Sequence, residues 1–187
     1  MNVITLAGSP RSPSRSAALL TIAQRWLEGR GIKVTPWNVF NFNAEDLLYA
    51  HFDSPALNDF VRQLAGADGV IISTPIYKAS FSGALKTLLD LLPERAFEHK
   101  VVLPLATGGS AGHMLALDYA LKPVLNALKA QEILHGVFSE DSQITRYDGD
   151  PLLSAALEGR LLESLETFTR ALERQSQFSP LHISSAL

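Results

Sequence analysis

Five short apolar runs alternate with five segments of helical periodicity along this chain of 187 residues. The runs lie at about 2–7, 33–39, 69–74, 100–107 and 133–138, and the helical segments at about 14–30, 54–65, 82–92, 114–129 and 151–174. Residues 70–72 and 101–103 are apolar at every position. Such runs are typical of strands that are buried on both faces of a parallel sheet.

The strict alternation of strand and helix predicts one α/β domain. We expect a doubly wound, five-stranded parallel sheet with helices on both faces, in three layers and with the flavodoxin-like strand order 2-1-3-4-5. The domain is expected to span residues 1–174, followed by a tail at 175–187 that is disordered or docks on a neighbouring subunit. In this fold ligands bind outside the carboxyl ends of the strands. The loops after the first, third and fourth strands should therefore share one chemistry.

The loop after the first strand is rich in groups that bind phosphate. Residues 9–16 hold four serines and two arginines between an apolar run and a helical segment. A helix N-terminus presents backbone N–H groups to anions, and guanidinium groups add charge-assisted donors. The loop predicts a phosphate cradle built from Ser9, Arg11, Ser14, Arg15 and Ser16. The alternative is a plain connector in which Ser14 or Ser16 caps the helix.

Other phosphate-binding motifs are absent from the sequence. There is no G-x-x-x-x-G-K-[ST], and Gly8 lacks the spaced glycines of a dinucleotide-binding loop. The chain has no cysteine, which excludes the cysteine-based phosphatases, disulfides and thiolate metal sites. The loop therefore suits the terminal phosphate of a mononucleotide such as FMN, and no metal site is expected.

Two further loops could line a planar heterocycle. The loop after the third strand begins with Pro75, Ile76, Tyr77 and Lys78, which suits a slot along one edge of a ring, although Tyr77 could also simply pack in a connector. The loop after the fourth strand begins with Thr107, Gly108, Gly109 and Ser110. Its glycines allow backbone amides to approach a ligand closely.

Charge and hydropathy exclude two classes of partner. The net charge is −3 and the basic residues are scattered among acids, which argues against nucleic-acid binding. No apolar run approaches the length of a membrane span, and the first residues do not resemble a secretion signal. We therefore expect a cytoplasmic protein that does not bind a membrane.

These motifs resemble the NAD(P)H-dependent FMN reductase family. Residues 8–11 (GSPR), 75–77 (PIY), 82–86 (SGALK) and 107–109 (TGG) carry the resemblance, which covers about residues 1–140. Residues 45–50, 88–95 and 118–123 are most similar to FMN reductases of two-component alkanesulfonate monooxygenase systems. The resemblance implies that NADPH reduces FMN and that reduced FMN leaves for a separate monooxygenase, which releases sulfite from sulfonates.

The resemblance also implies roles for individual residues. Ser9, Arg11, Ser14 and Ser16 would hold the FMN phosphate. Residues 75–77 would line the isoalloxazine, and residues 107–109 would lie along its far edge. Hydride transfer between two cofactors needs no acid–base side chain, so no catalytic residue is predicted. Because Arg11 and Arg15 could bind either the FMN phosphate or a 2′-phosphate, the preference between NADPH and NADH stays open.

Pro123 lies inside the predicted helix 114–129, where it removes a backbone hydrogen bond to Tyr119. A π-helical turn that directs Tyr119 outward is one local solution, and such turns concentrate at functional sites. The alternative is a buried tyrosine beside an ordinary proline kink. The related reductases have a tyrosine in a π-helix at a tetramer interface, so the resemblance assigns Tyr119 to flavin exchange.

Two alternative functions remain at this stage. Residues 108–112 (GGSAG) match G-x-S-x-G, so a serine hydrolase could use Ser110 with Asp141 or Asp148 and His182. A flavodoxin-like electron carrier would instead retain its FMN. The leucines around most of the girth of helix 82–92 must be buried by the sheet or by another subunit, and we expect a homo-oligomer, either a dimer or a tetramer.

Overall fold

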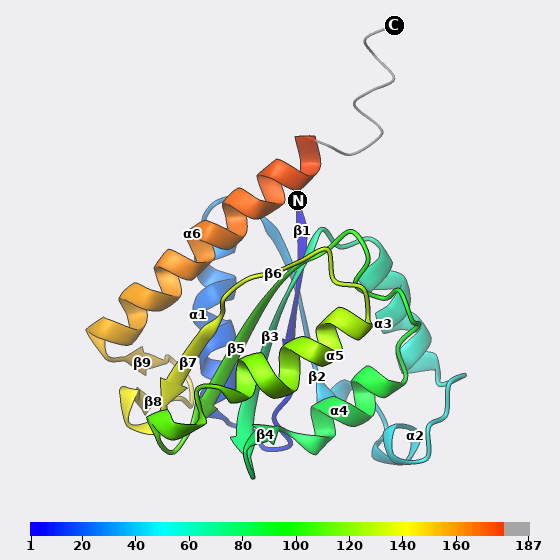
Figure 1. The fold of residues 1–187 in the computed structure, drawn as a ribbon, viewed down its shortest axis with the longest axis horizontal. Coiled ribbons are helices and arrows are strands. Elements are labelled where there is room, and N and C mark those ends of the chain that lie inside the picture. The colour runs from blue at the N-terminus through cyan, green and yellow to red at the C-terminus, as the bar shows by residue number, and fades with distance from the viewer. Residues whose placement is uncertain (178–187) are drawn as a thin grey trace, which may run out of the picture.

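A parallel sheet between two layers of helices forms the centre of the computed structural model, which describes residues 1–177 (Figure 1). The strands are β1 (Asn2–Ala7), β2 (Lys33–Asn38), β3 (Gly69–Tyr77), β5 (Val101–Gly108), β6 (Glu132–Ile133) and β7 (Val137–Glu140). The helices are α1 (Arg15–Glu28), α2 (Ala44–Leu48), α3 (Pro55–Ala65), α4 (Gly83–Asp90), α5 (Lys122–Ala127) and α6 (Ala155–Gln177). The sheet order is β2-β1-β3-β5-β6, with β7 also paired to β5. The predicted flavodoxin-like fold is confirmed.

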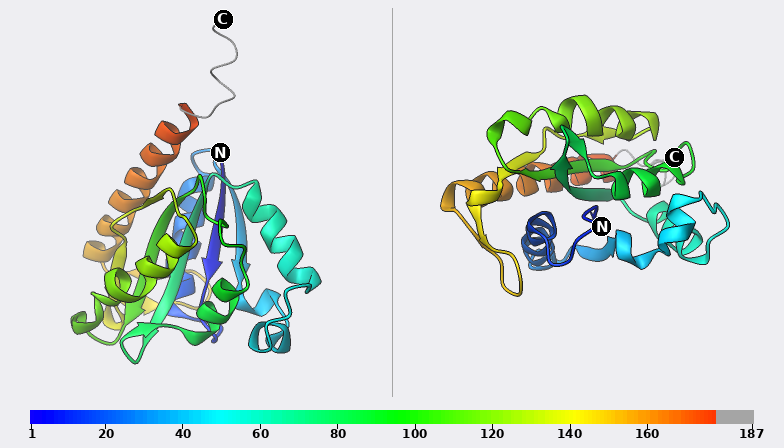
Figure 2. Two further views of the ribbon diagram at one scale, coloured as in Figure 1. Left: turned by 45° about the vertical axis from the view of Figure 1, so that its right-hand side comes forward. Right: turned by 90° about the horizontal axis from the view of Figure 1, so that it is seen from below.

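The helices cover both faces of the sheet because its strands are apolar on both. On one face, side chains of α3, α4 and α5 pack on Val70 and Ile72 of β3, and on the other, α1 and α6 pack on Ile71. Figure 2 shows these layers from below, the edge at which the central parallel strands end. The core thus holds β1, β3 and β5 in a fixed register, with their carboxyl ends together at one edge.

The predicted fifth strand is divided in two. Gly136, with φ of +89°, separates β6 from β7, and a Cβ atom there would lie 2.5 Å from the carbonyl oxygen of Pro104. Only glycine fits this position without strain, since other residues rarely adopt a positive φ. The interruption directs β7 along β5 as far as Gly108, where Glu140 is the strand partner.

Small elements that the periodicity did not indicate lie near the ends of the strands. Strand β4 (Ser80–Phe81) forms a hairpin with β3, α2 follows β2, and β8 (Ile144–Arg146) pairs with β9 (Leu152–Leu153). Each contains five residues or fewer, which is too short for a hydrophobic period to be visible.

The predicted helix 114–129 is not continuous. A 3₁₀ turn, η2 (Ala111–His113), is followed by a π-helical segment, η3 (Leu117–Leu121), and then by α5. Pro123 falls in the first turn of α5, where a missing N–H breaks no internal bond. Tyr119 lies in the π-helical segment and its side chain is 80% exposed.

The leucines of α4 are buried by the chain itself. Leu85, Leu88 and Leu89 all lie in the core beside the sheet, so their apolar character does not require another subunit. Helix α6 continues to Gln177, beyond the expected end at Arg174, and the rest of the predicted tail lies outside the described residues. Within residues 1–177, no helix combines the length and apolarity needed to cross a bilayer.

Two glycine substitutions test the backbone argument. Gly136→Ala should lower the free energy of unfolding by about 2–4 kcal/mol, because it adds backbone strain and a clash with Pro104. Gly159→Ala in α6, where an added Cβ meets no atom within 4 Å, should raise it by up to about 1 kcal/mol. Urea titration measures the free energy of unfolding of both variants. Equal changes in the two would contradict the claim that position 136 requires glycine.

Candidate functional site

A polar cleft of about 250 Å³ lies at the carboxyl ends of β1, β3 and β5. The loop after β1 and the last residues of β3 and β5 bring together side chains that are distant in sequence. The predicted site residues that line the cleft are Ser9, Arg11, Ser14, Arg15, Ser16, Pro75, Ile76, Tyr77, Thr107, Gly108 and Gly109. Lys78 and Ser110 are exposed and do not line it. The three strand ends therefore converge as expected, although residues 75–77 and 107–108, which were predicted to begin loops, are the last residues of β3 and β5.

The first loop is fixed to its neighbours at Gly8. Its amide donates to the Ser73 carbonyl at 2.8 Å, and its carbonyl accepts a hydrogen bond from the buried Ser82 hydroxyl. An added Cβ at Gly8 would lie 2.9 Å from Leu85, so the close approach to α4 requires glycine. The same Ser82 hydroxyl accepts from the Leu85 amide and caps α4. One side chain thus fixes both the loop after β1 and the start of α4.

The serines of this loop are oriented by hydrogen bonds to the backbone. The Ser9 hydroxyl donates to the Arg11 carbonyl at 3.0 Å and accepts from the Arg11 amide at 3.1 Å. Ser14 caps α1 by accepting from Ala17 at 3.2 Å, and its hydroxyl lies 3.3 Å from that of Ser16. The first turn of α1 has no acidic residue. The positive end of the helix dipole therefore faces the cleft without an acidic side chain from α1 itself.

The other two loops present backbone on the opposite side of the cleft. Pro75 and Thr107 are neighbours across the β3–β5 pairing, so the ends of these two strands lie side by side. Gly109 has no heavy atom within 4 Å of an added Cβ, which leaves its backbone open to a ligand. Lys78 and Ala79, with φ of +50° and +64°, form the tight turn between β3 and β4. This turn keeps Lys78 at the tip of the hairpin and out of the cleft.

Three residues of the cleft were not predicted as ligand-binding residues: Pro13, which lies within the first loop, Asp141 and Tyr147. Asp141 follows β7 and carries a carboxylate 3.9 Å from a guanidinium nitrogen of Arg15. The Tyr147 ring lies beneath the same guanidinium, 4.6 Å from ring centroid to Cζ. The Arg15 Nε is buried and has no hydrogen-bond partner among the described residues. No local motif marks Asp141 or Tyr147, since both reach the cleft through the β7 register and the β8–β9 hairpin.

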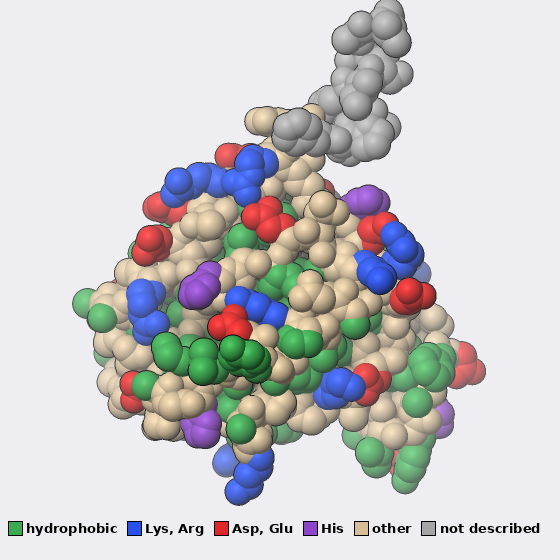
Figure 3. Space-filling model, viewed as in Figure 1, with side chains coloured by type: hydrophobic (Ala, Val, Ile, Leu, Met, Phe, Trp, Pro, Cys, Tyr) green, Lys and Arg blue, Asp and Glu red, His purple; other side chains and the backbone are tan. Residues whose placement is uncertain are grey.

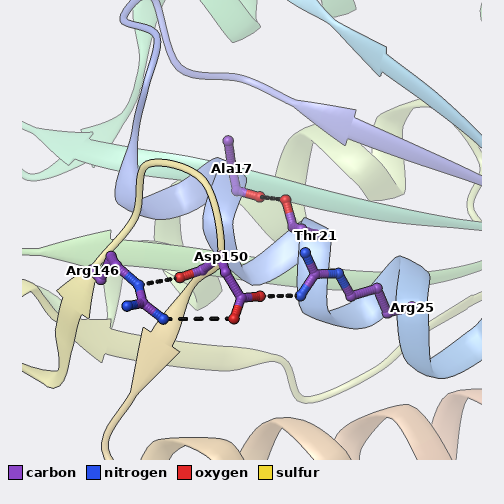
Figure 4. Close-up of polar contacts among 5 residues, drawn as sticks. All are labelled: Ala17, Thr21, Arg25, Arg146 and Asp150. Carbon is purple, nitrogen blue, oxygen red and sulfur yellow. Dashed lines mark hydrogen bonds and ion pairs between the residues drawn. The ribbon is translucent and has the colours of Figure 1, made fainter.

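The β8–β9 hairpin is attached to α1 by ion pairs (Figure 4). The Asp150 carboxylate pairs with Arg25 of α1 and with Arg146, whose Nε also donates to the Asp150 carbonyl. The hydrogen bond from Arg25 lowers the pKa of Asp150 below its ordinary value. The contacts hold the hairpin, and with it Tyr147, beside the start of α1.

A second hollow of about 640 Å³, which shares no lining residue with this cleft, lies between the η2–η3 segment and α6. Met114 and Leu115, which are 52% and 56% exposed, line it, together with polar residues of α6. Figure 3 shows hydrophobic side chains in a row on this side of the molecule, over the α5 layer. Among residues 1–177, no group of three or more His, Asp or Glu could hold a metal ion.

Comparison with known proteins identifies the family. A family model described as NADPH-dependent FMN reductase matches residues 1–144. The chain belongs to this family. It is therefore an NAD(P)H:FMN oxidoreductase, with FMN and NADPH as its cofactors. The membership decides against the serine hydrolase and the electron carrier, and Ser110 of the hydrolase motif lies outside the cleft.

Individual relatives of this reductase agree over nearly the whole chain. It is 63% identical over 175 residues to "FMN reductase (NADPH)" of Escherichia coli K12, covering 94% of this chain and 92% of the relative. A protein of the same name from Pseudomonas putida KT2440 is 59% identical, with 94% and 90% covered. A crystal structure of an NADH:FMN oxidoreductase in its apo form superposes with a TM-score of 0.82 at 33% identity, covering 91% and 89% of the two chains.

Replacing Ser82 tests how the first loop of this reductase is held. Ser82→Ala should lower the free energy of unfolding by about 2–3 kcal/mol, because it removes a helix cap and leaves the buried Gly8 carbonyl without its donor. Thr87→Ala in the same helix, whose hydroxyl bonds only within α4, should change it by less than about 0.5 kcal/mol. Chemical denaturation compares the two, and a similar loss in both would contradict the role of Ser82.

Proposed function

We propose that the cleft binds FMN, with the phosphate against residues 9–16 and the isoalloxazine between residues 75–77 and residues 107–109. The observation that carries the proposal is the convergence of the three loops on one cleft, with hydroxyls and guanidinium groups at one end. Arg15 lies at that end, and its buried Nε has no hydrogen-bond partner within residues 1–177. The donor set fits a phosphate monoester, which carries close to two negative charges at pH 7.

The phosphate end supplies donors of three kinds. Ser9, Ser14 and Ser16 offer hydroxyls, Arg11 and Arg15 offer charge, and the start of α1 offers its dipole. Ser9 and Ser16 are almost fully buried, so their positions are fixed by the fold before any ligand binds. Preorganised donors lose little conformational entropy on binding.

The ring end is built from backbone and from side chains without acid–base chemistry. Ile76 and Tyr77 form one side, and Gly108 and Gly109 allow the ring edge to reach backbone amides. The nicotinamide and flavin supply hydride transfer between themselves, and the protein contributes by aligning the two rings and limiting access of water. Tyr77 is 45% exposed at the mouth of the cleft, where it can pack on a bound ring.

We further infer that reduced FMN leaves the reductase and supplies a monooxygenase that acts on sulfonates. This step rests on the resemblance to reductases of alkanesulfonate systems. The exposed Tyr119 in the π-helical segment, near the apolar Met114 and Leu115, supports a homo-oligomer whose interface covers this surface and influences flavin exchange. Light scattering at micromolar concentration tests the oligomer, and a monomer would reject it.

A comparison of two flavins tests the phosphate assignment. Arg15→Gln should raise the dissociation constant for FMN about 10- to 100-fold, because a charge-assisted contact to the phosphate is lost. Riboflavin, which has no phosphate, should bind the variant and the wild-type protein alike. Arg62→Gln on α3 is the matched control and should change neither, since Arg62 does not line the cleft. Equal weakening of both flavins, measured by fluorescence quenching, would contradict the placement.

Tyr119→Ala tests the exchange role. The variant should retain FMN more persistently through gel filtration and should transfer reduced flavin to a trap more slowly. The reason is that the proposed interface, which influences flavin exchange, then lacks the Tyr119 side chain. Phe40→Ala, at an exposed aromatic residue away from the π-helical segment, is the control. Unchanged flavin retention and unchanged turnover with free FMN would count against the role.

A further inference from the structure

Asp141 places a negative charge at the end of the cleft where positive charge gathers. Its carboxylate lies 3.9 Å from a guanidinium nitrogen of Arg15, and both side chains line the cleft. The Asp141 side chain is 44% exposed and the Arg15 side chain 36%. The carboxylate is therefore close enough to compete with a bound anion for Arg15, and it is also accessible to solvent.

The position of Asp141 is fixed by several contacts. It directly follows Glu140, which pairs with Gly108 at the end of β7. The short turn that begins at Asp141 is closed by Gln143, whose side chain accepts from the Glu140 amide at 3.1 Å. Arg160 of α6 donates to the same side chain at 3.2 Å. These contacts hold the backbone on both sides of Asp141 and so place its side chain at the cleft.

Arg15 is held between two partners. The Tyr147 ring supports one face of the guanidinium, and Asp141 lies beside it. The hairpin that carries Tyr147 is attached to α1 through Arg25 and Asp150. The arrangement keeps Arg15 oriented whether or not an anion is present, and it adds a fixed charge of the same sign as the anion.

A carboxylate beside a phosphate site weakens the binding of a ligand that carries a phosphate, but not that of a ligand without one. Like charges within a few ångströms repel, and the carboxylate also shares the guanidinium that would otherwise serve the phosphate alone. A neutral residue at this position would favour tight retention of FMN. A negatively charged residue favours release, which suits an enzyme that must give up its flavin.

We propose that Asp141 is a positioning residue that weakens the binding of the FMN phosphate through Arg15 and thereby speeds flavin release. The inference rests on the proposed FMN site and adds to it the residue that sets affinity. On this proposal, Asp141 limits how tightly the polar cleft holds FMN. Asp141 takes no part in hydride transfer and moves no proton.

The test compares FMN with riboflavin in the Asp141→Asn variant. The dissociation constant for FMN should fall roughly three- to tenfold, since an exposed ion pair of this kind contributes modestly. Stopped-flow measurement should show slower FMN release by a similar factor. Riboflavin binding should not change. In about 1 M salt the difference for FMN should shrink, because screening then acts over about 3 Å.

Two matched variants control for charge and for folding. Asp148→Asn removes the same charge from the β8–β9 connection outside the cleft and should leave both flavins unaffected. Asp141→Glu keeps the charge and should keep FMN affinity close to that of the wild-type protein. Thermal unfolding of each variant shows that it is folded before binding is measured, and Asp141→Ala replaces Asp141→Asn if the latter is unstable.

The outcomes separate this inference from the proposed function. Unchanged or weaker FMN binding in Asp141→Asn overturns the inference, as does equal tightening of both flavins. If the wild-type protein binds riboflavin as tightly as FMN, the phosphate site itself fails. If the wild-type protein prefers FMN but Asp141→Asn does not tighten it, only the role of Asp141 fails.

Discussion

The parallel pairing of β1 with β3 and of β3 with β5 is the constraint on which the site depends. This register places the ends of three strands at one edge and carries their loops to one cleft. Apolar side chains on both faces of these strands keep the register, because a shift would expose them. The hydrogen bond from Ser82 to the Gly8 carbonyl then fixes the first loop against the start of α4. Apolar packing on both faces of the sheet thus positions the polar residues of the cleft at the ends of its strands.

Much of the fold could be predicted from the sequence because its main strands and helices are long enough to show a clear pattern of apolar residues. The doubly buried strands and the helices α1, α3 and α6 have enough residues to show their period. The division of the fifth strand at Gly136 could not be predicted, since it depends on the carbonyl of Pro104 in a neighbouring strand. The π-helical segment could be anticipated because a proline cannot continue a regular helix, so the helical turn before Pro123 must differ from the α-helix that Pro123 begins.

The candidate site could be predicted to the extent that its residues lie at or just after the ends of strands. Ser9 follows β1, and Pro75 and Thr107 lie near the ends of β3 and β5, so topology alone brings them together. Asp141 and Tyr147 reach the same cleft from a later part of the chain, through the β7 register and a hairpin tied to α1. Lys78 lies near the cleft in sequence but is carried away by the turn between β3 and β4. Such turns depend on backbone angles that a side-chain pattern does not reveal.

The cleft brings phosphate-binding groups and a carboxylate to the same end. Hydroxyls, guanidinium groups and a helix N-terminus favour a phosphate monoester, while a carboxylate beside Arg15 opposes it. Under the two proposals made above, neighbouring side chains of one cleft set both the binding and the release of FMN.

A crystal structure of the protein with FMN bound tests the central claim most directly. The account predicts that the phosphoryl oxygens lie beside Ser9, Arg11 and Arg15, with the ring between residues 75–77 and residues 107–109. Density for the phosphate elsewhere, for example in the larger hollow beside α6, would contradict it.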